Sequence, residues 1–367
     1  MSVFVPYTEL VEITGLTHDA INRVSGDLSA FLKNPSASGM LVRVVNGNAG
    51  AASGGVWGIN GGADTWYQAL PGTSGAVINA VRFEKDLGAV YTTGLNRMRY
   101  KLENASVKAY IVGEFHAGIA WHPVAVTVNP TAWAEHNTWL DRTVTVLGTD
   151  SVADVEAVIL SFTAGNIAAA GSIGLRAKGS TNADIFGLTK NEGGMGWEAV
   201  KVDSNGQYQV YGSMKEDPLT VGTFIKELGY IRKGAGYTAI EDPQKETLAT
   251  LGAYDMHSIS AIAPASARTA VLKWGWLSGT TAGVYAVARE KDASYGVYII
   301  VAEERAGCQV VPLNLDLEFE YFDTLADMGM YIVGYESYEP ADTSAATLTV
   351  DSGTSLVIES NSPGGIG

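Results

Sequence analysis

The sequence predicts an all-β protein, built from three tandem antiparallel β-sandwich units of jelly-roll type that are joined by short helices. Three observations lead to this prediction. Glycine makes up 43 of the 367 residues and falls mostly between short apolar runs, as is typical of tight turns between strands. Many short segments alternate apolar and polar residues, as strands with one buried face do. Several of these segments recur with a period of about 115 residues.

The first recurring segment is a short alternating pattern near the start of each unit. It reads DLSAFL at residues 27–32, TVTVLG at 143–148 and SISAIA at 258–263. Leu28, Val144 and Ile259 occupy the same place in this pattern, 116 and 115 residues apart. The alternation predicts a strand with one face directed inward. A helix is the competing prediction for the first copy.

The second recurring segment is an apolar strand, a turn of small residues and a further strand. The copies are SGMLVRVVNGNAGAASGGVWGINGG, VEAVILSFTAGNIAAAGSIGLRAKGS and RTAVLKWGWLSGTTAGVYAVARE. An alignment without gaps matches Leu41 with Val158, and a one-residue gap brings Val271 to the same place. Such strand–turn–strand pairs are the elements from which antiparallel sandwiches are built.

The third recurring segment closes each unit with a strand that carries a glycine. The copies are KAYIVGEF, TFIKELGYI and MYIVGYES, with Gly113, Gly229 and Gly334 at the shared place, 116 and 105 residues apart. The letters YIVG therefore occur twice because both copies spell a closing strand. An alternating strand precedes each copy, namely NRMRYKLEN, GQYQVYGS and LDLEFEYFD.

The three markers keep one order along the chain and divide it into repeated units. Residues 1–120 form the first unit, which is a candidate for attachment, residues 121–235 the second and residues 236–342 the third. Residues 343–367 form a C-terminal segment with one or two strands and a tail rich in glycine and serine. A unit of this length with many short strands fits a two-sheet jelly roll best.

Short helices are predicted at three places before or between the sandwiches. Each place has a residue type that is favoured at a helix start, some with apolar residues at helical spacing behind it. The residues are Thr17 as N-cap with Ala20, Ile21 and Val24 behind it, Pro130 at the first position of a second helix, and Pro243 at the first position of a third helix that stops at Gly252.

Charge and targeting features limit the partners and the place of action. The chain has 39 acidic and 24 basic residues, a formal net charge of −15. Nucleic acid and anionic membrane both require a basic face, so we expect neither as a partner. The N-terminal MSVFVPYTELVE does not have the pattern of a secretory signal, and no apolar run reaches the roughly 18 residues of a membrane span. We expect synthesis in a cytoplasm.

The search for catalytic residues predicts that the protein is not an enzyme and uses no cofactor or metal. Glu114, His116 and His122 come nearest to a metal-ligand cluster, but an ordinary surface between units is the preferred interpretation. Cys308 is the only cysteine and is expected to be a small buried residue in a strand. No GxSxG, Walker A or dinucleotide-binding pattern is present.

Carboxylates and tryptophans offer two further routes to carbohydrate chemistry. Asp316, Glu318 and Glu320 alternate along one predicted strand, and a solvated outer face explains them better than a glycosidase pair. The tryptophans could stack on sugars, but core or inter-domain packing is the commoner role. They do not recur at matching places in all three units, so the sequence predicts no repeated binding site. They are Trp57, Trp66, Trp121, Trp133, Trp139, Trp197, Trp274 and Trp276.

The order of segments resembles that of β-sandwich modules in virion proteins of tailed bacteriophages, such as fibres, head decorations and tail appendages. The resemblance is carried by HSISAIAPASARTAVLKW in the third unit and by GSIGLRAKGSTN, WEAVKVDSNGQYQVYGS and KELGYI in the second. The first unit departs from it, with GVWGINGG in place of GLRAKGS and Glu114 in place of the closing tyrosine. The resemblance implies a structural role and brings no catalytic residues.

Two functions remain open at this point. The first is a structural component of a bacteriophage virion, made in the host cytoplasm, which assembles with other virion proteins and with copies of itself as a homo-oligomer. Attachment to a host surface glycan is an additional role compatible with it. The alternative is a carbohydrate-binding or glycan-cleaving adhesin, for which Trp66 and Trp121 are the residues to test.

Overall fold

The computed structural model of the chain is all-β. No helix in the part of the chain that it describes is long and apolar enough to cross a membrane. The described residues are 2–18, 24–46, 54–58, 67–69, 75–83, 96–102, 105–128, 137–163, 171–182, 186–188, 195–213, 224–248, 250–276, 285–293, 297–300, 306–323 and 328–337.

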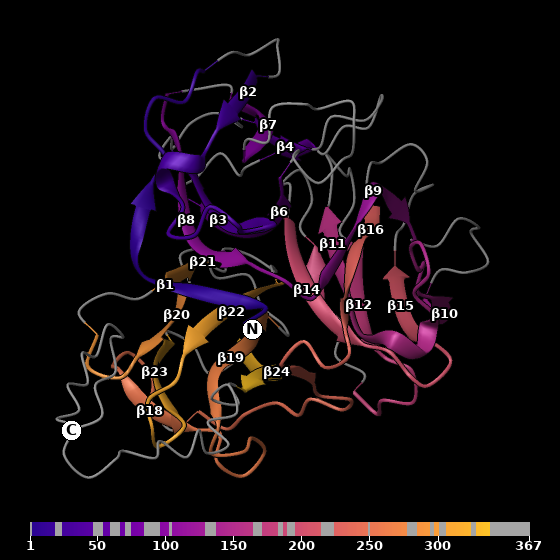
Figure 1. Ribbon diagram of the computed structural model, residues 1–367. Helices are drawn as coiled ribbons and strands as arrows, with labels where there is room; N and C mark the ends of the chain where they lie inside the picture. The colour runs from indigo at the N-terminus through magenta and orange to yellow at the C-terminus, as the bar shows by residue number, and fades with distance from the viewer. Residues whose placement is uncertain are drawn as a thin grey trace, which may run out of the picture.

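The strands of these residues form six four-stranded antiparallel sheets, two in each third of the chain (Figure 1). The first third has the strand orders β1-β8-β3-β6 and β2-β7-β4-β5. If the strands of each third are numbered one to eight, the orders 1-8-3-6 and 2-7-4-5 return in the second and last thirds. These orders define a jelly roll, in which eight strands make two facing sheets. The predicted fold class is therefore confirmed, and we name the three groups units 1, 2 and 3.

The strands are short, as expected for a jelly roll. Unit 1 holds β1 (Phe4–Glu12), β2 (Val24–Asp27), β3 (Gly39–Asn46), β4 (Gly54–Gly58), β5 (Tyr67–Ala69), β6 (Gly75–Arg82), β7 (Arg97–Leu102) and β8 (Val107–Phe115). Unit 2 holds β9 (Ile119–Thr127), β10 (Trp139–Thr143), β11 (Val155–Thr163), β12 (Gly171–Ala177), β13 (Phe186–Leu188), β14 (Met195–Lys201), β15 (Gln207–Ser213) and β16 (Phe224–Arg232). Unit 3 holds β17 (Tyr237–Ala239), β18 (Asp255–Ser258), β19 (Ala267–Trp276), β20 (Tyr285–Glu290), β21 (Val297–Ile300), β22 (Ala306–Pro312), β23 (Glu318–Asp323) and β24 (Met328–Ser337).

The closing strands of the units are equivalent in register. β8, β16 and β24 each lie beside the third strand of their unit, and their glycines face Leu41, Ile159 and Val271. The sequence alignment was thus correct for Leu41 and Val271. It was wrong by one residue in unit 2, where it chose Val158. Val158 and Ile159 are both apolar, so the sequence does not show where the bulge places the register.

All three units share one irregularity opposite this strand. In unit 1, residues 6–11 of β1 lie opposite residues 111–113 of β8, so β1 contains three extra residues at this place. Residues 121–126 show the same excess against β16. In unit 3, Ala239 pairs with Gly334 and Lys245 bridges to Tyr331. Residues 239–245 therefore contain three more residues than the part of β24 opposite them. The three units therefore share this local irregularity as well as their strand order.

The segments predicted as early alternating strands are turns that follow the second strand of each unit. β2, β10 and β18 end one residue before the matched apolar position, and a 3-10 helix (Ser29–Phe31) follows in unit 1. The matched residues are buried and donate their backbone N–H groups to equivalent carbonyls, which extends the pairing with the partner strand by one residue beyond β2, β10 and β18. The pairs are Leu28 with Asn96, Val144 with Gly206 and Ile259 with Leu317.

The predicted helices are not found where the structure describes those segments. Val24 begins β2 instead of continuing a helix. The segment after Pro243 is extended, since Lys245 bridges to Tyr331 and the N–H of Glu246 donates to a carbonyl of β24. A second 3-10 helix (Val152–Asp154) precedes β11. Residues 19–23, the Pro130 helix and the C-terminal segment 343–367 lie outside the described residues.

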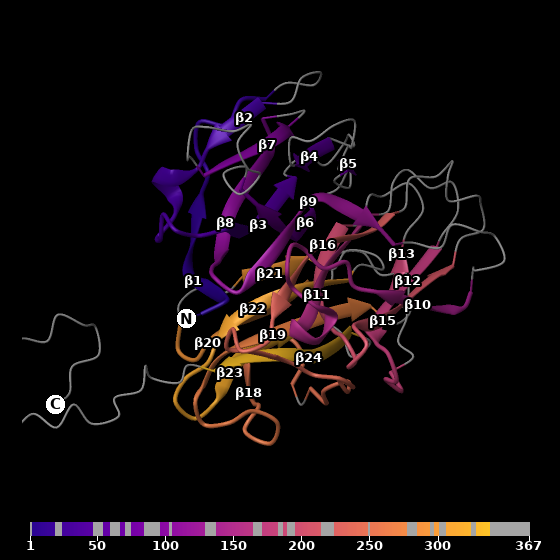
Figure 2. The same ribbon diagram turned by 45° about the vertical axis from the view of Figure 1, so that its right-hand side comes forward.

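The three units surround a common centre instead of forming an extended series. β6, β14 and β22, the sixth strands of the units, contact one another in all three pairings. Figure 1 shows the resulting three lobes, and the rotated view of Figure 2 agrees. Each of these strands is an edge of its sheet. The contacts therefore cover edges that would otherwise be free to pair with other chains.

Candidate functional site

Glu114 and His116 do meet, at a buried site inside unit 1. Oε2 of Glu114 lies 3.0 Å from Nε2 of His116. The backbone N–H groups of Lys33 and Asn34 donate to Oε1 at 2.6 and 3.2 Å, and the hydroxyl of Tyr7 also donates to it. Burial raises the pKa of Glu114, but these hydrogen bonds outweigh burial and lower it below its ordinary value. The carboxylate thus holds the 33–34 turn against the sheet.

His122 belongs to a different buried pair. Its Nε2 lies 2.6 Å from Oε1 of Glu227, and both side chains are buried in unit 2. Glu227 also accepts hydrogen bonds from the N–H of Thr145 at 2.8 Å and the hydroxyl of Tyr208 at 3.1 Å. The cluster considered from the sequence is therefore split in two. Among the described residues, no group of three or more His, Cys, Asp or Glu side chains could hold a metal ion.

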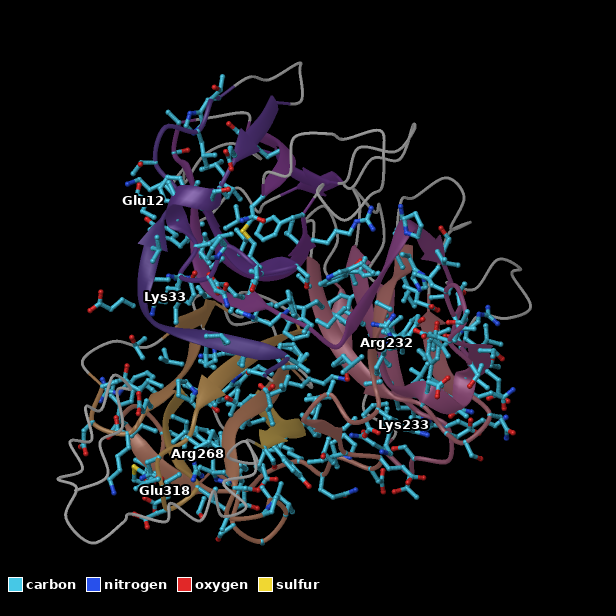
Figure 3. All side chains as sticks on the ribbon, viewed as in Figure 1. Glu12, Lys33, Arg232, Lys233, Arg268 and Glu318 are labelled. Carbon is cyan, nitrogen blue, oxygen red and sulfur yellow. The ribbon has the colours of Figure 1, made fainter. Side chains whose placement is uncertain are left out.

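Cys308, Glu318 and Glu320 lie as the sequence indicates, whereas Asp316 lies in the turn before β23 and not on the strand. Cys308 is fully buried on β22, and burial raises the pKa of its thiol. On β23 the side chains of Phe319 and Tyr321 are buried, whereas Glu318 and Glu320 face outward. Glu318 lies on the outer side of unit 3 in Figure 3, which labels it. The outward carboxylates form ion pairs and not a pair facing each other across a cleft.

The tryptophans divide between core and surface. Trp197 and Trp274 are fully buried, and Trp121 is 8% exposed, with its indole N–H donating to Ser38 in unit 1 at 3.0 Å. Trp121 is therefore an inter-unit residue and not a sugar platform. Trp139 is half-buried on the outer side of unit 2. The side chains of Trp57, Trp66, Trp133 and Trp276 lie outside the described residues.

An aromatic junction joins the three units. The ring of Phe4 in unit 1 lies 5.3 Å from Phe115 of the same unit, 5.9 Å from Trp197 of unit 2 and 5.3 Å from Tyr237 of unit 3, measured between ring centroids. The tilted and edge-on arrangements are those that aromatic pairs favour. One hydrophobic core consequently runs through residues of all three units.

Buried charged side chains also link the units at this junction. Glu336 of β24 accepts hydrogen bonds from Ser2 at 2.9 Å, from the N–H of Phe4 at 3.2 Å and from the N–H of Val3. Burial raises the pKa of Glu336 to about 7. Lys273 of β19 lies 2.8 Å from Glu198 of β14, so units 2 and 3 share a buried ion pair. Burial raises the pKa of Glu198, although Lys273 opposes the shift.

The outer face of one unit 2 sheet carries three rows of side chains across β10, β15 and β12, which we call the unit 2 face. The strand pairing aligns Trp139, Tyr211 and Gly174 in the first row. The second row is Asp141, Gln209 and Arg176, and the third pairs Thr143 with Gln207. Lys178, the first residue after β12, completes the third row by donating to Gln207 at 2.6 Å. The rings of Trp139 and Tyr211 lie 5.5 Å apart, and the Arg176 guanidinium lies 3.9 Å from the centre of the Trp139 ring.

Unit 3 repeats this arrangement on β18, β23 and β20, together with Tyr254 just before β18 and Lys291 just after β20, and we call this the unit 3 face. Tyr254 and Phe322 lie 5.4 Å apart in place of the unit 2 aromatic pair, and Arg289 stacks on Tyr254 at 3.6 Å. Glu320 and Glu318 replace the two glutamines, and Lys291 replaces Lys178. The sequence interpretation missed this repeat because it sought tryptophan alone. The recurring arginine of GLRAKGS and AVARE was the available signal.

Comparisons with known proteins show no established relative. No family model matches the chain, and no curated protein matches it. A structure described as "The Triple Jelly Roll Fold and Turret Assembly in an Archaeal Virus" matches 92% of this chain and 91% of its own, with 10% identity and a TM-score of 0.21. A structure of Sulfolobus Turreted Icosahedral Virus matches 91% of each chain with 10% identity and a TM-score of 0.21.

A tandem CBM22 domain of Paenibacillus barcinonensis Xyn10C matches as well. It covers 59% of this chain and 84% of its own, with 11% identity and a TM-score of 0.16. These TM-scores are too low for any of the three likenesses to carry an argument. The jelly-roll assignment rests on the strand orders of this chain.

Proposed function

We propose that the chain is a structural component of a virus particle and acts through protein–protein assembly, without catalysis. The observation that carries this proposal is the shared junction, in which Phe4, Trp197 and Tyr237 join three jelly rolls into one body. Such a body offers several sheet faces at fixed angles, which suits a symmetric assembly. The resemblance of units 2 and 3 to virion modules of tailed bacteriophages supports the same role, as fibre, head decoration or tail appendage.

The test is the composition of purified particles. Particles are banded from the lysate that contains the chain, and their proteins are identified by peptide mass spectrometry. Gold-labelled antibody against the chain then locates it by electron microscopy. We expect a fixed number of copies per particle, at sites related by symmetry. Absence of the chain from banded particles, while it stays abundant in the soluble lysate, would overturn the proposal.

A further inference from the structure

We propose that the unit 2 face binds an acidic saccharide, with a sugar ring against Trp139 and Tyr211 and its carboxylate at Arg176. This inference goes beyond the structural role and does not rest on it, since binding is a property of the isolated chain. It follows from a comparison of two faces that share one geometry and differ in charge.

The aromatic part of the unit 2 face is an extended apolar strip. Trp139 starts on β10, and its indole reaches as far as β12, two strands away. A Cβ atom on Gly174 of β12 would lie 2.5 Å from the far end of that indole, so the absence of a side chain there makes room for the ring. Trp139 and Tyr211 are both half-buried and therefore keep exposed surface. Aromatic rings of this kind accept the apolar face of a sugar while polar groups beside them bind its hydroxyls.

The charge of Arg176 is the feature that selects an acidic ligand. Its Nε donates to the neutral amide oxygen of Gln209 at 2.8 Å and its Nη1 to the carbonyl of Asn182 at 2.7 Å. In the unit 3 face, Nε of Arg289 instead lies 2.5 Å from the carboxylate of Glu320. Arg289 is thus neutralised by a direct partner on the sheet, whereas Arg176 forms no such ion pair among the described residues.

The second cation of each face has a carboxylate partner in both units. Nζ of Lys178 donates to Asp141 and to Gln207, both at 2.6 Å, while Nζ of Lys291 lies 3.2 Å from Glu318. The side chains of the second and third rows therefore sum to one positive charge in unit 2 and to none in unit 3. The carboxylate of Asp242 also interacts with Arg176 through space, but it is held by Ser180, Thr181 and the N–H of Asn182. Arg176 therefore keeps N–H groups that no carboxylate occupies, and these favour an anionic ligand.

A sugar carboxylate fits the remaining groups. The planar guanidinium of arginine matches a carboxylate with two parallel hydrogen bonds, and this geometry is specific for planar anions. The amides of Gln207 and Gln209 can exchange their present partners for vicinal hydroxyls. A uronic acid unit carries both the carboxylate and the hydroxyls on a ring that can rest on the aromatic strip.

The experiment measures binding of tetragalacturonate to the full chain by calorimetry and by NMR, with fully methyl-esterified tetragalacturonate, which has the same linkage and no charge, as the neutral comparator. We expect one site for the uronate per chain, at least tenfold tighter than the neutral sugar, and weaker binding as salt increases. Trp139→Ala should remove it. Equal affinity for the two sugars, or no binding of the uronate at all, would overturn the inference.

The two faces supply matched variants for each other. Gln209→Glu gives Arg176 the partner that Arg289 already has and removes the hydrogen bond that the Gln209 amide donates to Asp141 at 2.9 Å. It should weaken uronate binding at least tenfold. Glu320→Gln removes that partner in unit 3 and should create a second uronate site. Thermal unfolding of both variants controls for folding. If Gln209→Glu binds the uronate as well as the unaltered chain does, the assignment of Arg176 is wrong.

Discussion

The closing glycines are required because neighbouring atoms leave no room for a side chain. A Cβ atom on Gly229 would lie 2.3 Å from the carbonyl oxygen of Ala120 and 2.9 Å from the Cα of Trp121, both on the adjacent strand β9. At Gly113 the corresponding approach to Val5 is 3.1 Å. The backbone of the first strand therefore lies against these glycines at the irregularity that all units share. At Gly334, the glycine of the second YIVG, a Cβ atom would instead meet the side chain of Tyr237, so the two YIVG glycines are required by different neighbours.

Gly229→Ala should destabilise the protein. The atoms that the new methyl group meets belong to the backbone, so they can give way only by shifting a strand, and overpacking of this kind costs about 1–3 kcal/mol or more. The free energy of unfolding, from denaturant titration, should fall by that amount. Gly307→Ala is the control, since a Cβ there would meet no atom within 4 Å. An equal loss in both variants would contradict the explanation.

Glu336 should make stability depend on pH. Its pKa is about 7 in the folded chain against 4.5 as a free side chain, so the folded state holds a proton that the unfolded state has released. The stabilisation is complete below about pH 4.5 and is lost as the pH rises through 7. Its size is roughly 3 kcal/mol.

The measurement compares the unaltered chain with Glu336→Gln, whose amide stays neutral and keeps an oxygen for the backbone donors. The free energy of unfolding of the unaltered chain should fall relative to that of the variant between pH 4.5 and 8. Two curves that run parallel across this range would show that Glu336 ionises normally.

At the scale of elements, the sequence predicted what depends on local pattern and missed what depends on pairing. β7, β15 and β23 were located by alternation, and β15 and β23 each show the buried face that produces it. The turn after β2 was predicted as a strand from its apolar residues, but the backbone turns there, with the N–H of Phe31 donating to the carbonyl of Leu28. The segment after Pro243 has a helix start by composition, but β24 offers its backbone groups and the segment pairs with them.

Two elements from different units, β14 and β19, depend on one buried ion pair. Lys273→Met leaves the Glu198 carboxylate buried without its cation, which should cost about 3–5 kcal/mol. The double variant Lys273→Met with Glu198→Leu removes both charges and should recover most of that loss, as measured by denaturant titration. A double variant that is no more stable than Lys273→Met alone would show that packing of the lysine chain, and not its charge, is what matters.

At the scale of the whole molecule, the repeat predicted the units but not their arrangement. Phe4, Trp197 and Tyr237 look like ordinary core residues in sequence, and alternation cannot tell a residue buried within a unit from one buried between units. The candidate binding face was missed for a related reason. Its aromatic residue is Trp139 in unit 2 and Tyr254 in unit 3, so the position remains aromatic while the amino acid changes.

The shared junction predicts that the three units behave as one body. A compact chain of this length has a radius of gyration of about 21 Å, whereas three jelly rolls in a row would give a clearly larger value by small-angle scattering. Calorimetry should show one unfolding transition.

Phe4→Ala removes the ring that contacts units 2 and 3, at a cost of about 3–5 kcal/mol, and should separate an earlier transition of unit 1 from the rest. Leu315→Ala, at a side chain that is 79% exposed, is the control and should leave the single transition unchanged. Separate transitions in the unaltered chain would mean that the units fold independently, and the junction would then not hold them together.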